Sequence, residues 1–248
     1  STSRRFPEGL GNDSGQLDKT LMDHHKGLSV TARWEGFEEW YYKGRRPAPI
    51  YIPRFRNVGR QDSSFLRGYH LAGGANRIRG NSSEGVGSPL KQELSEAGPW
   101  QLNLYGFGEC LPYEDNKVNL DKDRKDNWGR PLLKIDCTFR ENEKNMNREM
   151  GETAAEILEK TGGKDIRVTN NISFPGNSNH EMGTARMGQD PGKSVLNAFN
   201  QVHAAANVFV TDGSCMVSGS CVNPSLTYMA LTARACDHAV KLLKKGEF

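Results

Sequence analysis

The 248-residue sequence lacks several features that would each define a class of protein. Its 33 basic and 30 acidic residues leave a net charge of only +3, and no basic run carries interleaved aromatic residues. Nucleic acid is therefore not an expected partner. No apolar run approaches the length of a membrane span, so we expect no membrane insertion. A soluble protein is predicted, and the cytoplasm and the periplasm are both compatible with the sequence.

Metal-site signatures are also missing. The five cysteines form no CxxC pair and have no spacing to histidines that suits zinc, which favours buried or half-buried thiols in a reduced protein. The acidic segment 116–129 lacks the glycine and the closing glutamate of a calcium loop, so a solvated hairpin is the better interpretation. No metal is expected.

A dinucleotide-binding fingerprint is absent as well. It requires a strand, a GxGxxG turn, a helix and an acidic residue about twenty positions later. Gly9, Gly11 and Gly15 imitate such a turn, but no apolar strand precedes them. We therefore interpret this segment as a surface loop.

The pattern that is present predicts strands in the first two thirds of the chain and one long helix. Short runs rich in β-branched and aromatic residues predict strands at 28–32, 40–42, 50–52, 101–107 and 132–139. A helix is predicted over Glu141–Thr161, because apolar residues recur on one face and Gly162 and Gly163 follow it. The residues of that face are Met146, Met150, Ala154, Ile157 and Leu158.

Near the C-terminus the sequence predicts a strand, a loop and a helix, and the start of that helix is a candidate binding site. The apolar run 208–210 predicts a buried strand, which ends in Thr211, Asp212 and Gly213. A Gly/Ser-rich loop follows, and Asn223 is predicted as the N-cap of a helix that ends at Gly246. Such a helix start directs backbone N–H groups and a positive dipole end at an electron-rich group.

Several spaced motifs resemble the signature of the glucose-methanol-choline (GMC) flavin oxidoreductases, with most similarity to the bacterial sugar and gluconate dehydrogenase branch. These motifs are HEMGT at 180–184, RMG at 186–188, DGS at 212–214 and NPSLT at 223–227. Gly15, Leu21, Asp23 and His24 also resemble a family segment near the flavin. His24 and His25 are open to two interpretations, as catalytic residues or as surface or capping histidines.

The resemblance implies FAD as the cofactor and a sugar, polyol or related alcohol as the small-molecule substrate. It implies that His180 removes the hydroxyl proton and that Asn223 orients the substrate oxygen. The alternatives are that His180 braces its loop and that Asn223 only caps the helix. The cofactor-binding residues implied by the resemblance are Asp212, Gly213, Ser214, Pro224, Ser225 and Thr227.

The resemblance also implies a domain organisation. Family members carry the glycine fingerprint near the start of a longer chain, so this sequence resembles a C-terminal half that acts with a missing N-terminal FAD-binding half. The expected fold is mixed α+β and α/β, with a partial FAD-binding (Rossmann-like) domain and a substrate domain on a mostly antiparallel sheet with helices on one face. The expected ranges are 1–26 for the edge of the FAD-binding domain, 27–170 for the substrate domain and 171–248 for the C-terminal part of the FAD-binding domain.

Two functions remain open at this level. In the first, the chain is the catalytic half of an FAD-dependent dehydrogenase acting on CH–OH groups, and it lacks on its own a surface for the adenine and pyrophosphate of FAD. In the second, it is a non-catalytic carbohydrate-binding or interaction fragment.

Overall fold

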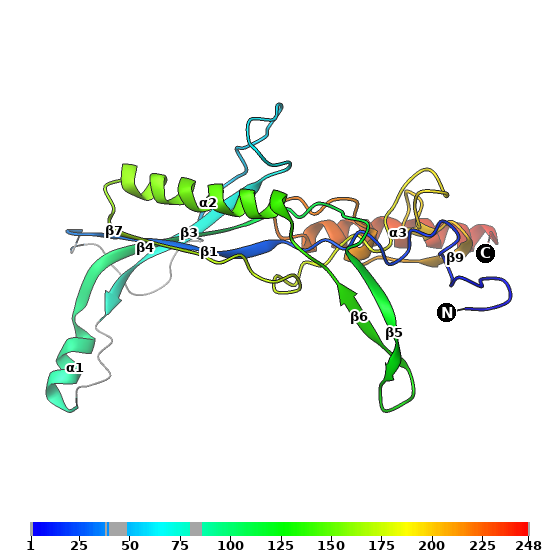
Figure 1. The fold of residues 1–248 in the computed structure, drawn as a ribbon, viewed down its shortest axis with the longest axis horizontal. Helices are drawn as coiled ribbons and strands as arrows, with labels where there is room; N and C mark the ends of the chain where they lie inside the picture. The colour runs from blue at the N-terminus through cyan, green and yellow to red at the C-terminus, as the bar shows by residue number, and fades with distance from the viewer. Residues whose placement is uncertain (1, 38, 40–48, 80–85, 248) are drawn as a thin grey trace. The chain divides into compact units, whose positions relative to one another are not determined.

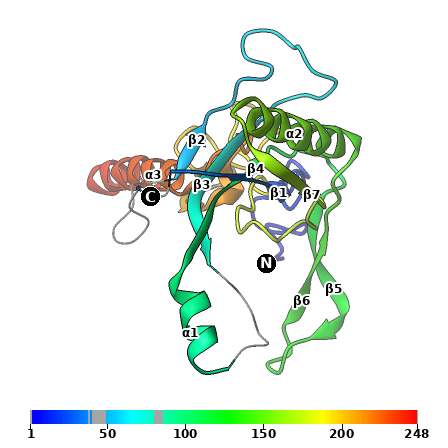
Figure 2. The same cartoon turned by 90° about the vertical axis from the view of Figure 1, so that its left-hand side faces the viewer.

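The computed structural model describes residues 2–37, 39, 49–79 and 86–247. The chain divides into two compact units, and each unit is assembled from separated segments. Unit 1 consists of Ser1–His25, Glu109–Glu143 and Phe174–Phe248. Unit 2 consists of Lys26–Gly108 and Lys144–Ser173. Figure 1 and Figure 2 show the elements of both units.

Unit 2 is built on a five-stranded sheet with the strand order β2-β3-β4-β1-β7. The pairs β2–β3, β3–β4 and β1–β7 are antiparallel, which confirms the antiparallel sheet predicted from the sequence. The predicted strand at 40–42 lies outside the described residues. The strand bounds are His25–Trp34 for β1, Ile50–Ile52 for β2, Tyr69–Arg79 for β3, Ala97–Gly108 for β4 and Lys164–Asn170 for β7.

Helix α2, Glu141–Lys160, lies along one face of this sheet (Figures 1 and 2). The predicted apolar face is confirmed, because Met146, Met150, Ala154 and Leu158 are buried and pack against residues of β1, β3 and β4. Burial of each large apolar side chain contributes about 1.5–3 kcal/mol. The shorter helix α1, Ser88–Ser95, has no buried residue among those described.

Unit 1 contains two antiparallel ribbons in its described part. The first is the predicted hairpin, formed by β5, Lys117–Lys125, and β6, Pro131–Asp136. The second joins β8, Gln201–Val202, to β9, Ala205–Phe209. No doubly wound parallel sheet is present among the described residues of the unit, so the Rossmann-like assignment stays a prediction.

The long helix α3, Ser225–Lys245, packs on the second ribbon (Figure 1). Leu231 of α3 and Val208 of β9 both border a small core made of Ala185, Val195, Leu196, Val202 and Cys215. The helix ends at Gly246 with a φ of 70°, as the sequence predicted, because glycine adopts this left-handed conformation without strain.

Two local expectations were wrong. The predicted buried strand at 208–210 is β9 at Ala205–Phe209, which is only partly buried because a two-stranded ribbon leaves one face uncovered. The N-cap of α3 is Pro224 and not Asn223, since the Pro224 carbonyl accepts the first helical hydrogen bond, from Tyr228 N at 3.0 Å. Asn223 therefore stands one residue before the cap.

None of the helices in the described ranges combines the length and the apolar character that a membrane span requires.

Candidate active site

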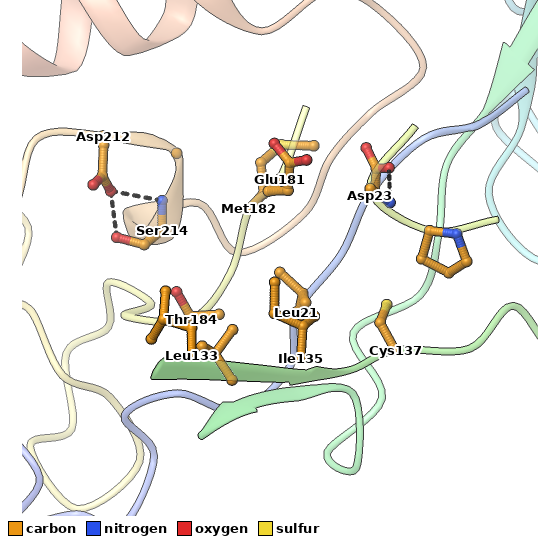
Figure 3. Close-up of a pocket in the computed structure, with 14 residues that line it drawn as sticks. Leu21, Asp23, Leu133, Ile135, Cys137, Glu181, Met182, Thr184, Asp212 and Ser214 are labelled. Carbon is orange, nitrogen blue, oxygen red and sulfur yellow. Dashed lines mark hydrogen bonds between the residues drawn. The ribbon is translucent and has the colours of Figure 1, made fainter. Parts of the chain in front are cut away.

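A cavity of about 520 Å³ lies within unit 1 (Figure 3). Leu133 and Ile135 of β6 make one side of it apolar. The loops that carry two of the sequence motifs also line it, through Glu181, Met182, Thr184, Asp212, Gly213 and Ser214. The structure thus brings the predicted residues Asp212, Gly213 and Ser214 beside the segment that directly follows His180.

Backbone hydrogen bonds join these two loops. Gly183 N donates to Gly213 O at 3.3 Å, and Ala185 N donates to Ser214 O at 2.9 Å. A Cβ at Gly213 would lie 2.5 Å from the Glu181 carbonyl oxygen and 2.6 Å from Tyr228 Oη. Both distances are shorter than side chains tolerate, so glycine is required for this close approach.

The turn that follows β9 is held by its own side chains. Asp212 caps the short 3₁₀ helix η1, Gly213–Cys215, by accepting from Ser214 N at 2.9 Å and from Ser214 Oγ (Figure 3). Both bonds end on Oδ1, so Ser214 does not use the second carboxylate oxygen. The turn places a carboxylate and a hydroxyl side by side at the cavity wall.

His180 is positioned by a short antiparallel pairing. Met22 and Met182 exchange two backbone hydrogen bonds, each 2.9 Å long. In this register the residue two positions after Met22 lies opposite the residue two positions before Met182, which are His24 and His180. Their Nδ1 atoms are 2.8 Å apart, and the rings meet edge to face with centroids 4.9 Å apart.

Asp23 fixes the turn that leads to His180. The residue is only 1% exposed, and its carboxylate accepts from His24 N at 2.8 Å, from Gly176 N at 2.8 Å and from Ser178 Oγ. A buried carboxylate is costly unless it is hydrogen-bonded, and these donors supply that compensation.

His24 is completely buried, so its interpretation as a surface residue was wrong. Burial lowers the pKa of His24 to about 4, although the carbonyls of Ser220 and Gly219 oppose that shift. The imidazole of His24 is therefore neutral at neutral pH. His180 is half-buried and lies at the other end of the shared hydrogen bond.

The start of α3 forms a second part of the candidate site. Asn223, Ser225 and Thr227 are exposed, and Pro224 is buried. These four residues do not line the 520 Å³ cavity in the described structure. They follow closely after Ser220, whose carbonyl contacts His24 Nε2 at 2.8 Å. The roles assigned to His180 and Asn223 stay predictions.

Tyr228 is a site residue that the sequence motifs did not indicate. It lies in the first turns of α3 beside Gly213, and within the described structure its Oη is buried without a hydrogen-bond partner. Burial raises the pKa of Tyr228 to about 12, so the phenol keeps its proton. No local pattern distinguishes this tyrosine, because its environment comes from Gly213 and Glu181.

Comparison with known proteins identifies the family. Residues 112–232 match the family model described as GMC oxidoreductase. The chain is also 33% identical over 250 residues to 2-methyl-1,2-propanediol dehydrogenase of Mycolicibacterium austroafricanum, covering 96% of this chain. This chain belongs to the GMC oxidoreductase family. GMC oxidoreductases depend on FAD.

Two further similarities extend over almost the whole of this chain. It is 28% identical over 251 residues to the fructose dehydrogenase large subunit of Gluconobacter japonicus, covering 98% of this chain. A crystal structure of formate oxidase matches 95% of the chain with a TM-score of 0.57 and 13% identity, which supports the fold. The chain spans 44% of the length of each of the two dehydrogenases and 49% of the formate oxidase chain.

The residues of the site fit a cofactor that carries hydroxyl groups and phosphates. Asp212 has a carboxylate oxygen that Ser214 does not use, and Tyr228 has a buried hydroxyl without a partner. The first turn of α3 supplies backbone N–H groups at a positive dipole end, which suits negative charge. A polyhydroxylated chain with a pyrophosphate, such as that of FAD, has the complementary groups.

Proposed function

We propose that this chain is the catalytic C-terminal part of an FAD-dependent dehydrogenase that oxidises a CH–OH group of a sugar, polyol or related alcohol. The observation that carries the proposal is the joining of the loop after His180 to the Asp212–Ser214 turn around one cavity. The two similar dehydrogenases, named for a diol and for fructose, support the substrate class.

Oxidation of an alcohol removes a proton from oxygen and a hydride from carbon. FAD, when bound, supplies the acceptor for the hydride. His180 accepts the hydroxyl proton, because a neutral imidazole is a base near neutral pH. Asn223 cannot accept a proton, but its amide can donate a hydrogen bond to the substrate oxygen and hold it in line.

The cofactor-binding residues act in two groups. Asp212, Gly213 and Ser214 hold the hydroxyl- and phosphate-bearing part of FAD through the carboxylate, the hydroxyl and the backbone of this turn at the cavity wall. Pro224, Ser225 and Thr227 provide the positive end of α3, which stabilises negative charge on the flavin ring.

A separate FAD-binding half is part of the proposal. Leu226, Met229 and Leu243 are 78%, 68% and 65% exposed and share one face of α3 with Val240. Contiguous exposed apolar residues mark an interaction surface. We assign this face to contact with the N-terminal half that the longer relatives contain, and residues 1–26 and 171–248 to the same FAD-binding domain around a substrate domain at 27–170.

A substitution in the FAD-loaded enzyme tests the proposal. His180→Ala removes the base and should reduce turnover by about 10²–10⁴-fold while the flavin absorbance is retained. His238→Ala is the matched control, because His238 stacks on Phe199 and is outside the cavity. Unchanged turnover in His180→Ala contradicts the base assignment. A protein that binds no FAD even with its N-terminal half present favours the alternative of a non-catalytic fragment.

A further inference from the structure

His24 has both ring nitrogens engaged in the interior of unit 1. Its Nε2 lies 2.8 Å from Ser220 O and 3.3 Å from Gly219 O. Its Nδ1 lies 2.8 Å from Nδ1 of His180. The side chain is completely buried, so its proton positions are set by these neighbours.

The two carbonyl contacts determine which nitrogen of His24 carries the proton. A carbonyl oxygen only accepts hydrogen bonds, so Nε2 of His24 must be the N–H donor. A neutral imidazole has one N–H, and therefore Nδ1 of His24 is an acceptor. The short Nδ1–Nδ1 contact then requires the proton to come from His180.

From this chain of hydrogen bonds we propose that His24 is a positioning residue that holds His180 in the tautomer with its proton on Nδ1 and its lone pair on Nε2. The inference rests on the proposed function, in which His180 is the base. The partner of a functional histidine commonly fixes its tautomer in this way, usually with a carboxylate or a carbonyl. Here a second histidine has that role.

A neutral partner has a consequence that a carboxylate would not have. When His180 takes the substrate proton on Nε2, its Nδ1–H donates a charge-assisted hydrogen bond to His24. His24 stabilises this imidazolium through a hydrogen bond alone, without a full negative charge, and so it raises the basicity of His180 less than an aspartate would. The Met22–Met182 pairing and the loop at 219–220 hold the two rings in register.

The first test locates the proton directly. In the FAD-loaded enzyme labelled with ¹⁵N-histidine, long-range ¹H–¹⁵N correlations distinguish a protonated from an unprotonated ring nitrogen, and the His180→Ala spectrum assigns the His180 signals. We expect His180 to be protonated on Nδ1 and unprotonated on Nε2 at neutral pH. The opposite pattern overturns the inference, and this measurement needs no variant of His24.

The second test separates positioning from packing. His24→Phe preserves a planar ring but removes the acceptor, and it should lower kcat by about 10–100-fold, with KM little changed and flavin absorbance retained. His24→Gln offers one acceptor and one donor, and it should recover most of that loss. Wild-type kcat in His24→Phe, or no recovery in His24→Gln, contradicts the role of the acceptor.

The outcomes distinguish this inference from the proposed function. Suppose that His180→Ala keeps its turnover and that His180 of the wild-type enzyme carries its proton on Nδ1. The base assignment then fails and the positioning contact stands. Suppose instead that His180→Ala is inactive and that His180 of the wild-type enzyme carries its proton on Nε2. The base assignment then stands and the inference about His24 fails.

Discussion

The carboxylate of Asp23 accepts a hydrogen bond from the hydroxyl of Ser178, a residue 155 positions later in the chain. The same carboxylate accepts from Gly176 N at 2.8 Å. Together these bonds attach the segment before β1 to the turn that precedes His180. The site in unit 1 therefore depends on a buried acidic group at the cavity wall.

Asp23→Asn should destabilise the protein. An amide that replaces the carboxylate places an N–H₂ group against a backbone N–H or a hydroxyl, and a buried donor loses its acceptor. We expect the free energy of unfolding to fall by about 1–3 kcal/mol, measured by urea denaturation. Asp123→Asn, on the exposed part of β5, is the control and should change stability by less than about 0.5 kcal/mol. Equal effects of the two substitutions would show that the Asp23 bonds are unimportant.

Gly213→Ala should damage the cavity. The new Cβ would lie 2.5 Å from the Glu181 carbonyl oxygen, and a backbone atom cannot move away cheaply. We expect a loss of about 1–3 kcal/mol in stability together with weaker FAD retention, followed by thermal unfolding and flavin absorbance. Gly74→Ala is the matched control, because its Cβ would meet no atom within 4 Å. Full FAD retention in Gly213→Ala would argue against a role of the Asp212–Ser214 turn in holding the cofactor.

The free energy of unfolding should decrease as the pH falls from 7 to 5, and His24 should account for part of this decrease. Burial lowers the pKa of His24 in the folded protein from 6.5 to about 4. Below pH 6.5 the unfolded chain binds this proton and the folded chain does not, so stability is present above that pH and is lost as the pH falls toward 4. The loss between pH 7 and pH 5 should be about 2 kcal/mol.

Comparison with His24→Gln isolates that contribution. The titratable neighbours His180 and Asp23 are the same in both proteins, and glutamine does not titrate. The difference in unfolding free energy between wild type and variant should therefore shrink by about 2 kcal/mol from pH 7 to pH 5. A difference independent of pH would mean that the pKa of His24 is not lowered in the folded protein.

Met229→Glu tests the exposed apolar face of α3. If the FAD-binding half covers this face, a buried charge without a partner should weaken FAD retention at least about tenfold, which corresponds to about 1.4 kcal/mol. The thermal stability of this chain alone should not change, since Met229 is 68% exposed in it. Leu94→Glu in α1, at a residue that is 41% exposed, is the control. Equal FAD retention in both variants would contradict the proposal that the FAD-binding half covers this face of α3.

Local patterns predicted the elements whose environment is local. The spacing of Met146, Met150 and Ala154 identified both the helix α2 and its buried face. The charged turn around Asp126 identified the hairpin of β5 and β6. The strand β9, Ala205–Phe209, was predicted at 208–210 and as fully buried, because an apolar run does not reveal how many strands flank it.

The site was predicted where a motif carries its own geometry. The sequence placed Asp212, Gly213 and Ser214 together because they are consecutive, and the structure puts them at one cavity wall. It left His24 undecided, since two adjacent polar residues in a loop give no sign of burial. The position of His24 comes from Met182, Ser178 and Ser220, all more than 150 residues away in the chain.

The interleaving of the two units affects how the protein is made. Met22 can pair with Met182 only after Met182 and the 159 residues between them have left the ribosome. Long-range contacts of this kind form slowly, because the loop between them must close first. Unit 2 is contained wholly in that interval, so during synthesis it can fold before the histidine pair forms. We therefore expect the contact between His24 and His180 to form after unit 2 has folded.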